Sequence, residues 1–459
     1  MKTVQFGWLG VVRLGLVQTS LGAIVVLTTS TINRVMVVEL ALPAMLPGAL
    51  VALHYALQIL RPRVGHGSDI TRRRTPWIIG GMAVLALGGV AAAAATALMA
   101  VSFYAGLAVA VLAFAAIGGG VSAAGTTLLV LLAKLTPPSR RPAAATIVWL
   151  MMIAGFAVTA TIVGQLLDPF SLGRLVIVSS VVGLTAFLMT VLALRNLERA
   201  NASDIAADIK DSTRERAFGK ALHSTWADQK ARLFTIFIFM SMLAYSMQDL
   251  ILEPFAGIVF NYTPGQTTSL SGLHHGGVFI GMVLVGVCGT LVGGRLLGSL
   301  RLWMVTGCIA SALALAGIVA AALAEWAAIL RPCVFALGVA NGAFAIAAIS
   351  TMMSMAGEGQ KGREGIRMGV WGAAQGIAFG LGGFIGTVAI DVARLTIAND
   401  SSAYAIVFAI EGGLFLLAAS IAYRLDARNA WVEAGLPRLA WSIGAPLATG
   451  SLKRSAIDD

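Results

Sequence analysis

Twelve apolar stretches, most of them about 20 residues long, constrain this chain more than any other feature of its sequence. An α-helix of that length crosses the roughly 30 Å hydrocarbon core of a bilayer. Hydrophobic residues make up 58% of the chain and charged residues only 12%, against about 25% charged in soluble proteins. Only helices or closed barrels span lipid, and continuous rather than alternating apolar runs exclude a barrel. The sequence predicts an all-α polytopic membrane protein.

The apolar stretches fall into two groups of six. The expected helices cover residues 14–36, 43–60, 77–99, 104–133, 144–167, 175–194, 233–254, 272–297, 302–323, 330–355, 368–392 and 404–423. A polar segment of mixed charge separates the groups, which predicts an N-terminal six-helix bundle at 1–195, a linker at 196–232, a C-terminal bundle at 233–424 and a tail at 425–459. An offset of 222 residues aligns Arg141, Trp149 and Gly164 with Arg363, Trp371 and Gly386, so we expect the groups to be repeats.

The net charge of +11 follows the expected topology rather than a nucleic-acid partner. With the amino terminus in the cytoplasm, 28 of the 32 Lys and Arg residues lie on the inside, as short cytoplasmic loops favour. The other four are Arg34, Arg174, Arg331 and Arg394. We therefore expect both termini in the cytoplasm, membrane lipids as the surroundings, and no binding of nucleic acid. Arg13 interrupts the first apolar run, so no cleavable signal peptide is expected.

A short basic loop between the second and third expected helices has a recognisable pattern. Gly65, Asp69 and the arginines 72–74 are spaced Gly-x-x-x-Asp-x-x-x-Arg-Arg. This pattern resembles the loop between helices two and three of major facilitator transporters, although a solvated basic loop would also explain it. The resemblance implies a major facilitator fold, with twelve transmembrane helices in two six-helix halves. It also implies a cytoplasmic gate formed by Gly65, Asp69, Arg72, Arg73 and Arg74, with Asp69 facing the start of helix eleven.

Ionisable groups inside a membrane are costly, which makes them candidates for function. His54 lies near the middle of the second expected helix, and Gln58 follows one turn later on the same face. A neutral imidazole could bind the magnesium of a chlorin, so His54 and Gln58 are candidate pigment-binding residues. A histidine bonded between helices is the alternative.

A second candidate joins the two halves. Asp249 and Glu253 share one face of the seventh expected helix and would repel each other if both were ionised. We expect Arg34, next to Asn33 near the end of the first helix, to lie beside both carboxylates. A static clamp and a moving gate or proton site are both consistent with such a cluster.

The remaining reactive residue types predict no further site. His66, His223, His274 and His275 are expected in loops or at helix ends, in contact with solvent. The three cysteines stand singly in apolar helices. Phosphate-binding, nucleophile-elbow and paired Cys/His motifs do not occur, so neither an enzyme nor a metal site is expected.

Three stretches together resemble a narrower family. They are residues 31–40 (Thr-Ile-Asn-Arg-Val-Met-Val-Val-Glu-Leu), 65–69 (Gly-His-Gly-Ser-Asp) and 248–257 (Gln-Asp-Leu-Ile-Leu-Glu-Pro-Phe-Ala-Gly). They are similar to the PucC/LhaA family, the bacteriochlorophyll-delivery branch of the major facilitator superfamily in phototrophic bacteria. Residues 121–126 depart from the pattern, because light-harvesting assembly members have a His and a Gln in this helix.

The resemblance implies a protein of the bacterial inner or intracytoplasmic membrane that handles bacteriochlorophyll. It would assist pigment delivery to light-harvesting or reaction-centre polypeptides, or between pigment-synthesis enzymes, without being an enzyme itself. Bacteriochlorophyll would be cargo, and no cofactor is required. The alternative is a proton-coupled secondary transporter of another small molecule, in which Asp249 and Glu253 carry protons.

Overall fold

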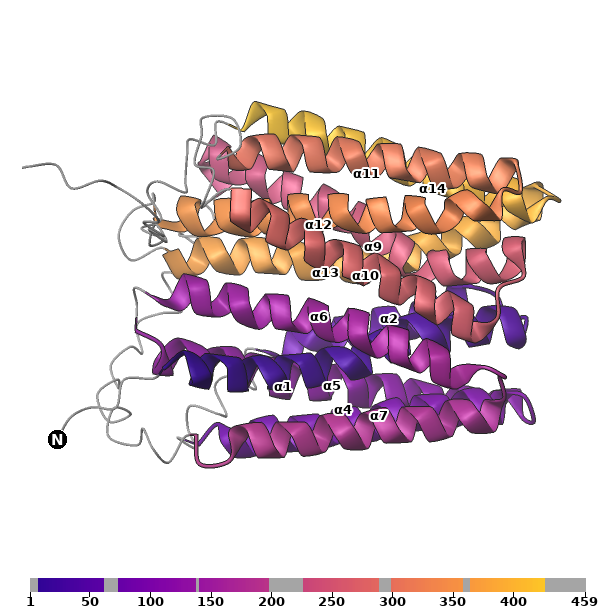
Figure 1. The fold of residues 1–459 in the computed structure, drawn as a ribbon, viewed down its shortest axis with the longest axis horizontal. Coiled ribbons are helices and arrows are strands. Elements are labelled where there is room, and N and C mark those ends of the chain that lie inside the picture. Colours follow the sequence, from indigo (N-terminus) through magenta and orange to yellow (C-terminus); the bar gives the residue numbers. More distant parts are fainter. Residues whose placement is uncertain are drawn as a thin grey trace, which may run out of the picture.

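The computed structural model describes residues 7–61, 73–137, 140–197, 226–288, 299–357 and 364–425. All regular elements in these ranges are helices (Figure 1). The first half contains α1 (Trp8–Val26), with the π-helical turns η1 (Leu27–Ile32) and η2 (Val35–Glu39), then α2 (Met45–Ala56), the 3-10 turn η3 (Leu57–Leu60), α4 (Thr75–Met99), α5 (Phe103–Leu135), α6 (Arg141–Leu167) and α7 (Leu172–Leu194). The second half contains α9 (Gln229–Phe260), α10 (Pro264–Val287), α11 (Leu300–Leu323), α12 (Ala327–Gly357), α13 (Glu364–Thr396) and α14 (Asp400–Arg424).

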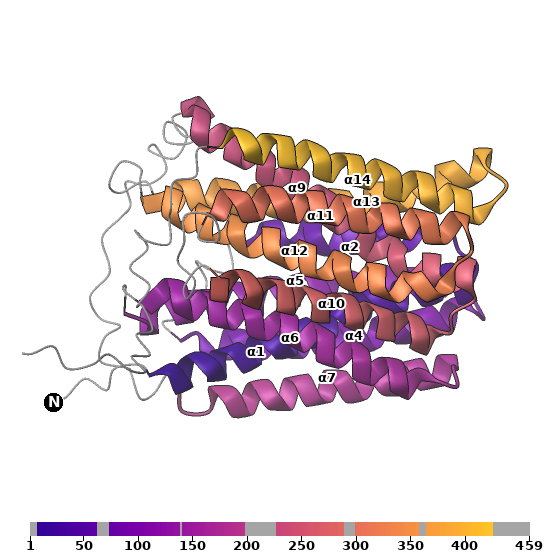
Figure 2. The same cartoon turned by 45° about the horizontal axis from the view of Figure 1, so that its top comes forward.

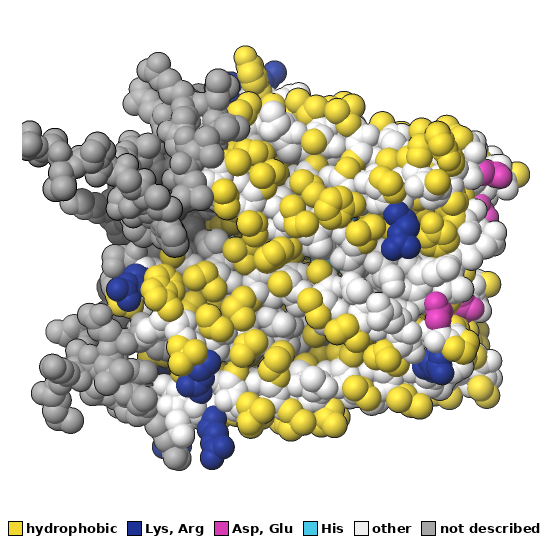
Figure 3. Space-filling view, viewed as in Figure 1, with side chains coloured by type: hydrophobic (Ala, Val, Ile, Leu, Met, Phe, Trp, Pro, Cys, Tyr) yellow, Lys and Arg dark blue, Asp and Glu magenta, His cyan; other side chains and the backbone are white. Residues whose placement is uncertain are grey.

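The helices run side by side along one direction, as Figures 1 and 2 both show. Eleven described helical segments are long and apolar enough to cross a membrane, and α2 is a shorter twelfth. Apolar side chains cover much of the visible face, while most charged side chains in view lie toward its two ends (Figure 3). We call the end where α1 begins and α14 finishes the termini end, and the opposite end the far end.

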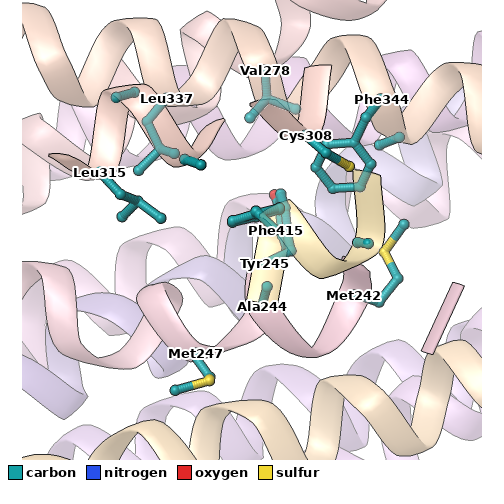
Figure 4. Packing of buried hydrophobic residues seen from close by; sticks show 14 of the residues in the cluster. Met242, Ala244, Tyr245, Met247, Val278, Cys308, Leu315, Leu337, Phe344 and Phe415 are labelled. Atoms are coloured by element: carbon teal, nitrogen blue, oxygen red, sulfur yellow. The ribbon is translucent and has the colours of Figure 1, made fainter. Parts of the chain in front are cut away.

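Each half has its own hydrophobic core. Buried side chains from α1 to α7 form one cluster, which gains Leu250 from the second half. Those from α9 to α14 form the other, part of which is seen in Figure 4. This second cluster also includes Met152 and Ile153 from α6. Most of the predicted linker and all but the first residue of the predicted tail lie outside the described residues, so their boundaries stay predictions.

Two pairs of helices make most of the contact between the halves: α6 with α10, and α2 with α13. Small residues permit close approach in both pairs. A Cβ atom on Gly272 would lie 2.5 Å from Thr161 Oγ1 of α6, and one on Gly48 would lie 2.1 Å from Thr387 Oγ1 of α13. Both positions therefore require glycine if the halves are to keep this spacing.

The start of α10 corrects one prediction. The sequence placed this helix at residue 272, because its polar beginning was interpreted as a loop, but it begins at Pro264. Thr263 and Gln266 form a capping box that stabilises this start. As a result, His274 and His275 lie within the helix and are only 2% and 7% exposed. The expectation that these two histidines contact solvent was wrong.

The seventh expected helix also extends further than predicted. Pro254 was taken as its end, yet α9 continues to Phe260 with Pro254 inside it.

The π-helical turns η1 and η2 that follow α1 occur at a run of hydroxyl side chains, Thr28 to Thr31. Thr28 Oγ1 lies 3.3 Å from the Ile24 carbonyl and 2.8 Å from the Val25 carbonyl, and such bonds compete with regular helical ones. The turns place Asn33 and Arg34 toward the second half.

Candidate functional site

The main polar connection between the halves lies toward the far end, where η1 and η2 face α9 and α10. Asn33 Nδ2 donates to the Leu250 carbonyl at 2.7 Å, and Arg34 Nη2 donates to the Tyr262 carbonyl at 2.8 Å. Both side chains are almost completely buried. The two residues thus hold the first half to the backbone of α9 and of the turn after it.

Arg34 lies against α9 one turn from Glu253, since a Cβ atom on Gly257 would be 3.0 Å from its Nη2 atom, so the expected neighbourhood is present. Its ion pair, however, is with Glu39 rather than with Asp249 or Glu253. The reason is the π-helical geometry, in which residues five apart come together. Glu39 follows Arg34 by five residues and meets its guanidinium group. A carboxylate on the same helix therefore neutralises Arg34, while the arginine still bonds to the second half.

Glu253 is surrounded by hydroxyl groups instead. It is 1% exposed, and Thr268 Oγ1 lies 3.5 Å from its Oε2 atom. Thr268 also lies 3.1 Å from Thr31 of the first half, and Ser30 and Ser271 form a parallel pair at 3.2 Å. Glu253 therefore belongs to a buried polar cluster shared by α9, α10 and η1.

His54 and Gln58 contact each other on α2 and η3, as their one-turn spacing suggests. The His54 Nε2 atom lies 3.3 Å from Gln58 Nε2, whereas His54 Nδ1 has no hydrogen-bond partner. The imidazole ring is 2% exposed because α2 packs closely on α5. A Cβ atom on Gly118 of α5 would lie 2.6 Å from the His54 carbonyl oxygen. One imidazole nitrogen is thus chemically available, but the ring is enclosed in this conformation.

An aromatic contact continues from His54 across to the second half. The His54 ring lies 4.7 Å from Tyr55, and Tyr55 stacks on Phe379 of α13 at 6.0 Å. Phe379 in turn contacts Tyr245 of α9 at 5.8 Å. Asp249 lies one turn after Tyr245 and is half-buried. These side chains line the middle of the contact between the halves.

Most of the predicted gate loop lies outside the described residues, namely Gly65, Asp69 and Arg72. Of the remaining members, Arg73 is exposed and Arg74 is 2% exposed, just before α4. The gate and the contact of Asp69 with helix eleven therefore stay predictions.

Two carboxylates at the far end were missed by the sequence analysis. Asp391 of α13 accepts the backbone N–H groups of Ala44 and Met45 at 3.0 and 2.7 Å, at the start of α2. Asp168, after α6, accepts the Thr263 hydroxyl at 2.8 Å, at the start of α10. The two aspartates are 223 residues apart, within one residue of the proposed repeat offset. Each half thus contributes a carboxylate to a helix N-terminus of the other, where a negative charge is favourable.

A second missed feature is a polar network inside the second half. His274 Nε2 lies 3.1 Å from Gln248 Nε2 and 3.5 Å from Asn341 Nδ2. The Ser311 hydroxyl donates to Asn341 Oδ1 at 2.8 Å. Glu411 of α14 is also completely buried, and neither of its carboxylate oxygens has a hydrogen-bond partner. An acidic residue in an apolar stretch was a signal available from the sequence.

Comparisons with known proteins give a consistent result. The family model described as PUCC protein matches residues 31–430. The chain is 52% identical over 419 residues to the "Bacteriochlorophyll synthase 44.5 kDa chain" of Rhodobacter capsulatus, covering 91% of this chain and 96% of that protein. It is 30% identical over 428 residues to "Protein PucC" of Cereibacter sphaeroides, covering 88% and 89%.

Solved structures agree on the fold. A D-xylose-proton symporter has a TM-score of 0.69 at 12% identity, with 92% of this chain and 99% of that chain covered. A bacterial homologue of the lysosomal transporter Spinster, in an inward-facing conformation, has a TM-score of 0.66 at 13% identity, with 93% and 97% covered. The predicted major facilitator fold is confirmed, and this is a multi-pass membrane protein.

Proposed function

Because this chain belongs to the PUCC protein family, we propose that it binds bacteriochlorophyll, or a late precursor, and passes it on during assembly of photosynthetic complexes. The observation that carries this proposal is the 52% identity to a protein named as a chain of bacteriochlorophyll synthase, over 91% of the present sequence. The recipients would be light-harvesting or reaction-centre polypeptides, or other pigment-making enzymes. The membrane would be the bacterial inner or intracytoplasmic membrane, with the termini end in the cytoplasm, as the arginine and lysine distribution favours.

The pigment would bind at His54. Its Nδ1 atom has no partner, and a single neutral imidazole nitrogen suffices to bind the magnesium of a chlorin. Because the ring is 2% exposed, binding requires α2 to move against α5. A chlorin is large and amphipathic, so it would enter sideways from lipid rather than through an aqueous channel.

The role we propose is not catalytic. The word synthase in the relative's name describes a chain of that complex, and a pigment carrier would serve such a complex without changing a covalent bond. Incubation of the purified protein with pigment should leave the pigment chemically unchanged.

Co-purification of pigment tests the proposal. The protein is extracted in mild detergent from pigment-producing cells, and a chlorin absorption band is measured relative to protein. We expect the band in the wild type and its loss in His54→Ala. His275→Ala is the matched control, because His275 is equally buried but lies in the second half, bonded to the Ser271 carbonyl at 2.9 Å. Absence of pigment from the wild type, with normal photosynthetic complexes in a deletion strain, would refute the proposal.

The second candidate function is proton-coupled transport of another small molecule. The half-buried Asp249, one turn after Tyr245 on α9, favours it, since intramembrane carboxylates often act in proton relays. Asp249→Asn would then abolish gradient-driven uptake while leaving photosynthetic complexes intact. Under pigment handling, the expected deficit is in those complexes instead.

A further inference from the structure

The polar cluster around Glu253 contains buried oxygen atoms that no hydrogen-bond donor reaches. The Glu253 side chain is 1% exposed, and its Oε1 atom has no hydrogen-bond partner. The Oδ1 atom of Asn33, a side chain buried to the same degree, has no partner either. Buried polar atoms are nearly always bonded, so two orphaned oxygens in one cluster indicate a ligand. The proposed pigment function uses neither residue.

Pro254 explains why Asn33 lies on the same face of α9 as Glu253. Proline has no N–H group, so the Leu250 carbonyl loses the helical hydrogen bond that residue 254 would donate. Asn33 Nδ2 donates to this carbonyl instead, at 2.7 Å. Leu250 and Glu253 are three residues apart and share one face of the helix. The Asn33 side chain is thus held on the face of α9 that carries Glu253.

Four hydroxyl groups, two from each half, complete the cluster. The Thr268 Oγ1 atom of α10 lies 3.5 Å from Glu253 Oε2 and 3.1 Å from Thr31 Oγ1 of η1. Ser271 follows Thr268 by three residues on the same face of α10, and its Oγ atom lies 3.2 Å from that of Ser30. All four side chains are buried. The cluster therefore consists of buried oxygen atoms supplied by both halves.

The spacing of these oxygen atoms fits the ligands of a shared ion. The distances of 3.1, 3.2 and 3.5 Å are longer than the about 2.5–3.0 Å of ordinary O–H···O hydrogen bonds. Two oxygen atoms bound at right angles, each about 2.4 Å from one hard cation, are about 3.4 Å apart. In addition, η1 is π-helical, and irregular helices are where transporters bind sodium. The spacing and the backbone both favour a cation.

The charges at the cluster favour a monovalent cation. Arg34 lies against the same face of α9 at Gly257, but its ion pair with Glu39 neutralises it. The Glu253 carboxylate therefore remains without a counter-charge, and buried charges are normally paired or bound to a metal. Oxygen ligands suit hard cations rather than transition metals. A single carboxylate balances the charge of Na⁺, whereas a divalent ion would keep an excess positive charge in a buried site.

We propose that Glu253, Asn33 and the four hydroxyl groups form a sodium-binding site in the contact between the halves. The carboxylate comes from α9, the hydroxyl groups come from α10 and η1, and the amide oxygen comes from Asn33. Because the ligands belong to both halves, the site is complete only while the halves meet here. Sodium therefore binds this conformation preferentially and stabilises the contact between η1 and the second half.

Equilibrium binding of radioactive sodium to the purified, pigment-free protein tests this site. We expect saturable binding that excess NaCl displaces and choline chloride at equal ionic strength does not. Glu253→Gln removes the negative charge and should abolish this binding. Thr268→Val keeps the shape of the side chain but removes a ligand, so binding should be several-fold weaker. Thr268→Ser keeps the hydroxyl group and should bind sodium nearly as well as the wild type.

The matched control is Glu411→Gln, because Glu411 is an equally buried acid of the same half whose oxygens contact no hydroxyl group. This variant should bind sodium like the wild type. Thermal unfolding is a second measurement: sodium should raise the unfolding temperature of the wild type and leave that of Glu253→Gln unchanged. If Glu253→Gln does not fold, the comparison of Thr268→Val with Thr268→Ser still tests the site.

Two results would overturn the proposal. The first is a wild-type protein without displaceable sodium binding. The second is equal affinity for sodium in the wild type and in Thr268→Val or Glu253→Gln. Because no pigment is present in these measurements, either result would leave the proposed handling of bacteriochlorophyll untouched.

Discussion

The two halves share a fold but distribute buried polar groups differently. In the first half, the buried ionisable side chains are Arg34, His54 and Arg74, among the described residues. Arg34 lies between the π turns η1 and η2, His54 lies in the last turn of α2, and Arg74 directly precedes α4. The second half buries two carboxylic acids and two histidines, which are Glu253, Glu411, His274 and His275. Three further polar side chains, Gln248, Asn341 and Ser311, form a network with His274.

The two halves pack their helices in the same way, although their buried polar groups differ. Both halves bring helices together through glycine: a Cβ atom on Gly120 would lie 2.7 Å from the Leu85 nitrogen in the first half, and one on Gly342 would lie 2.0 Å from the Val278 carbonyl in the second. Close packing through glycine is therefore common to the two halves. Among the described residues, buried carboxylic acids are confined to the second half. The first half meets the cluster around Glu253 through the hydroxyl groups of Ser30 and Thr31.

The largest effect is expected when the arginine that connects the halves is removed. Arg34→Ala leaves Glu39 without its partner and the Tyr262 carbonyl without its donor. Because Arg34 is buried while the Glu39 side chain is 34% exposed, losing the pair should cost less than the about 3–5 kcal/mol of a fully buried one. The Tyr262 carbonyl left without its donor adds to this cost, so we still expect a large loss of folded protein. Thermal unfolding in detergent measures it. The control is Arg394→Ala, whose partly exposed pair with Asp400 should be worth at most about 1 kcal/mol. Equal losses would mean that Arg34 is not the main connection.

A glycine substitution tests the packing that the halves share. Gly342→Ala places a methyl group 2.0 Å from the Val278 carbonyl of α10, and overpacking of this kind costs about 1–3 kcal/mol. Gly120→Ala in the first half should cost less, because the nearest atom is 2.7 Å away. Gly276→Ala and Gly119→Ala are the matched controls, since a Cβ atom at either position meets nothing within 4 Å. Unfolding temperatures in the reverse order would contradict the packing described here.

The fold was predictable from the sequence because apolar length and basic loops depend on local composition. The expectation of twelve helices in two groups follows from that information, whereas the major facilitator architecture was implied by the resemblance of the loop at 65–74. The positions of helix ends were predicted less accurately. The start of α10 was missed because its Thr and Ser residues resemble a loop, whereas in the protein they bond to Glu253 and to hydroxyls of η1.

The predicted partners of site residues depended on geometry that composition does not specify. The i,i+5 spacing between Arg34 and Glu39 brings them together only because the chain forms a π turn there. Asp391 approaches the start of α2 only because α13 packs on α2. Glu411 is different: its position in an apolar stretch was visible, and the rule that intramembrane acids are functional candidates applied to it.

The polar network of the second half should contribute a moderate amount of stability. Asn341→Leu removes the acceptor of Ser311 and one contact of His274, which should cost about 1–3 kcal/mol because the remaining groups are buried. Ser122→Ala in the first half removes a hydroxyl that bonds mainly to Gly118 of its own helix and should cost about 0.5–1.5 kcal/mol. Denaturant or thermal unfolding compares the two. If Ser122→Ala is the more damaging change, the second half does not hold the more important network.

The smallest effect concerns the two aspartates, Asp391 and Asp168, that each half contributes to a helix start of the other. Asp391→Asn keeps the shape of the side chain but removes the charge that stabilises the start of α2. A charge at a helix N-terminus is worth about 0.3–1 kcal/mol, so opening of the far end should become roughly two- to fivefold more frequent. Spin labels at Gly173 and Ala398, placed at the far ends of the two halves in a background without the three native cysteines, measure this opening as a distance distribution.

Asp168→Asn should have the weaker effect of the pair, because Asp168 bonds to the Thr263 side chain and Thr263 itself caps α10. The two aspartates act at separate helix starts, so their effects on the open population should add in free energy when both are changed. A double variant that opens no more than Asp391→Asn alone would show that α2 and α13 govern the far end by themselves. The asymmetry between the halves would then extend from their cores to the contact that closes them.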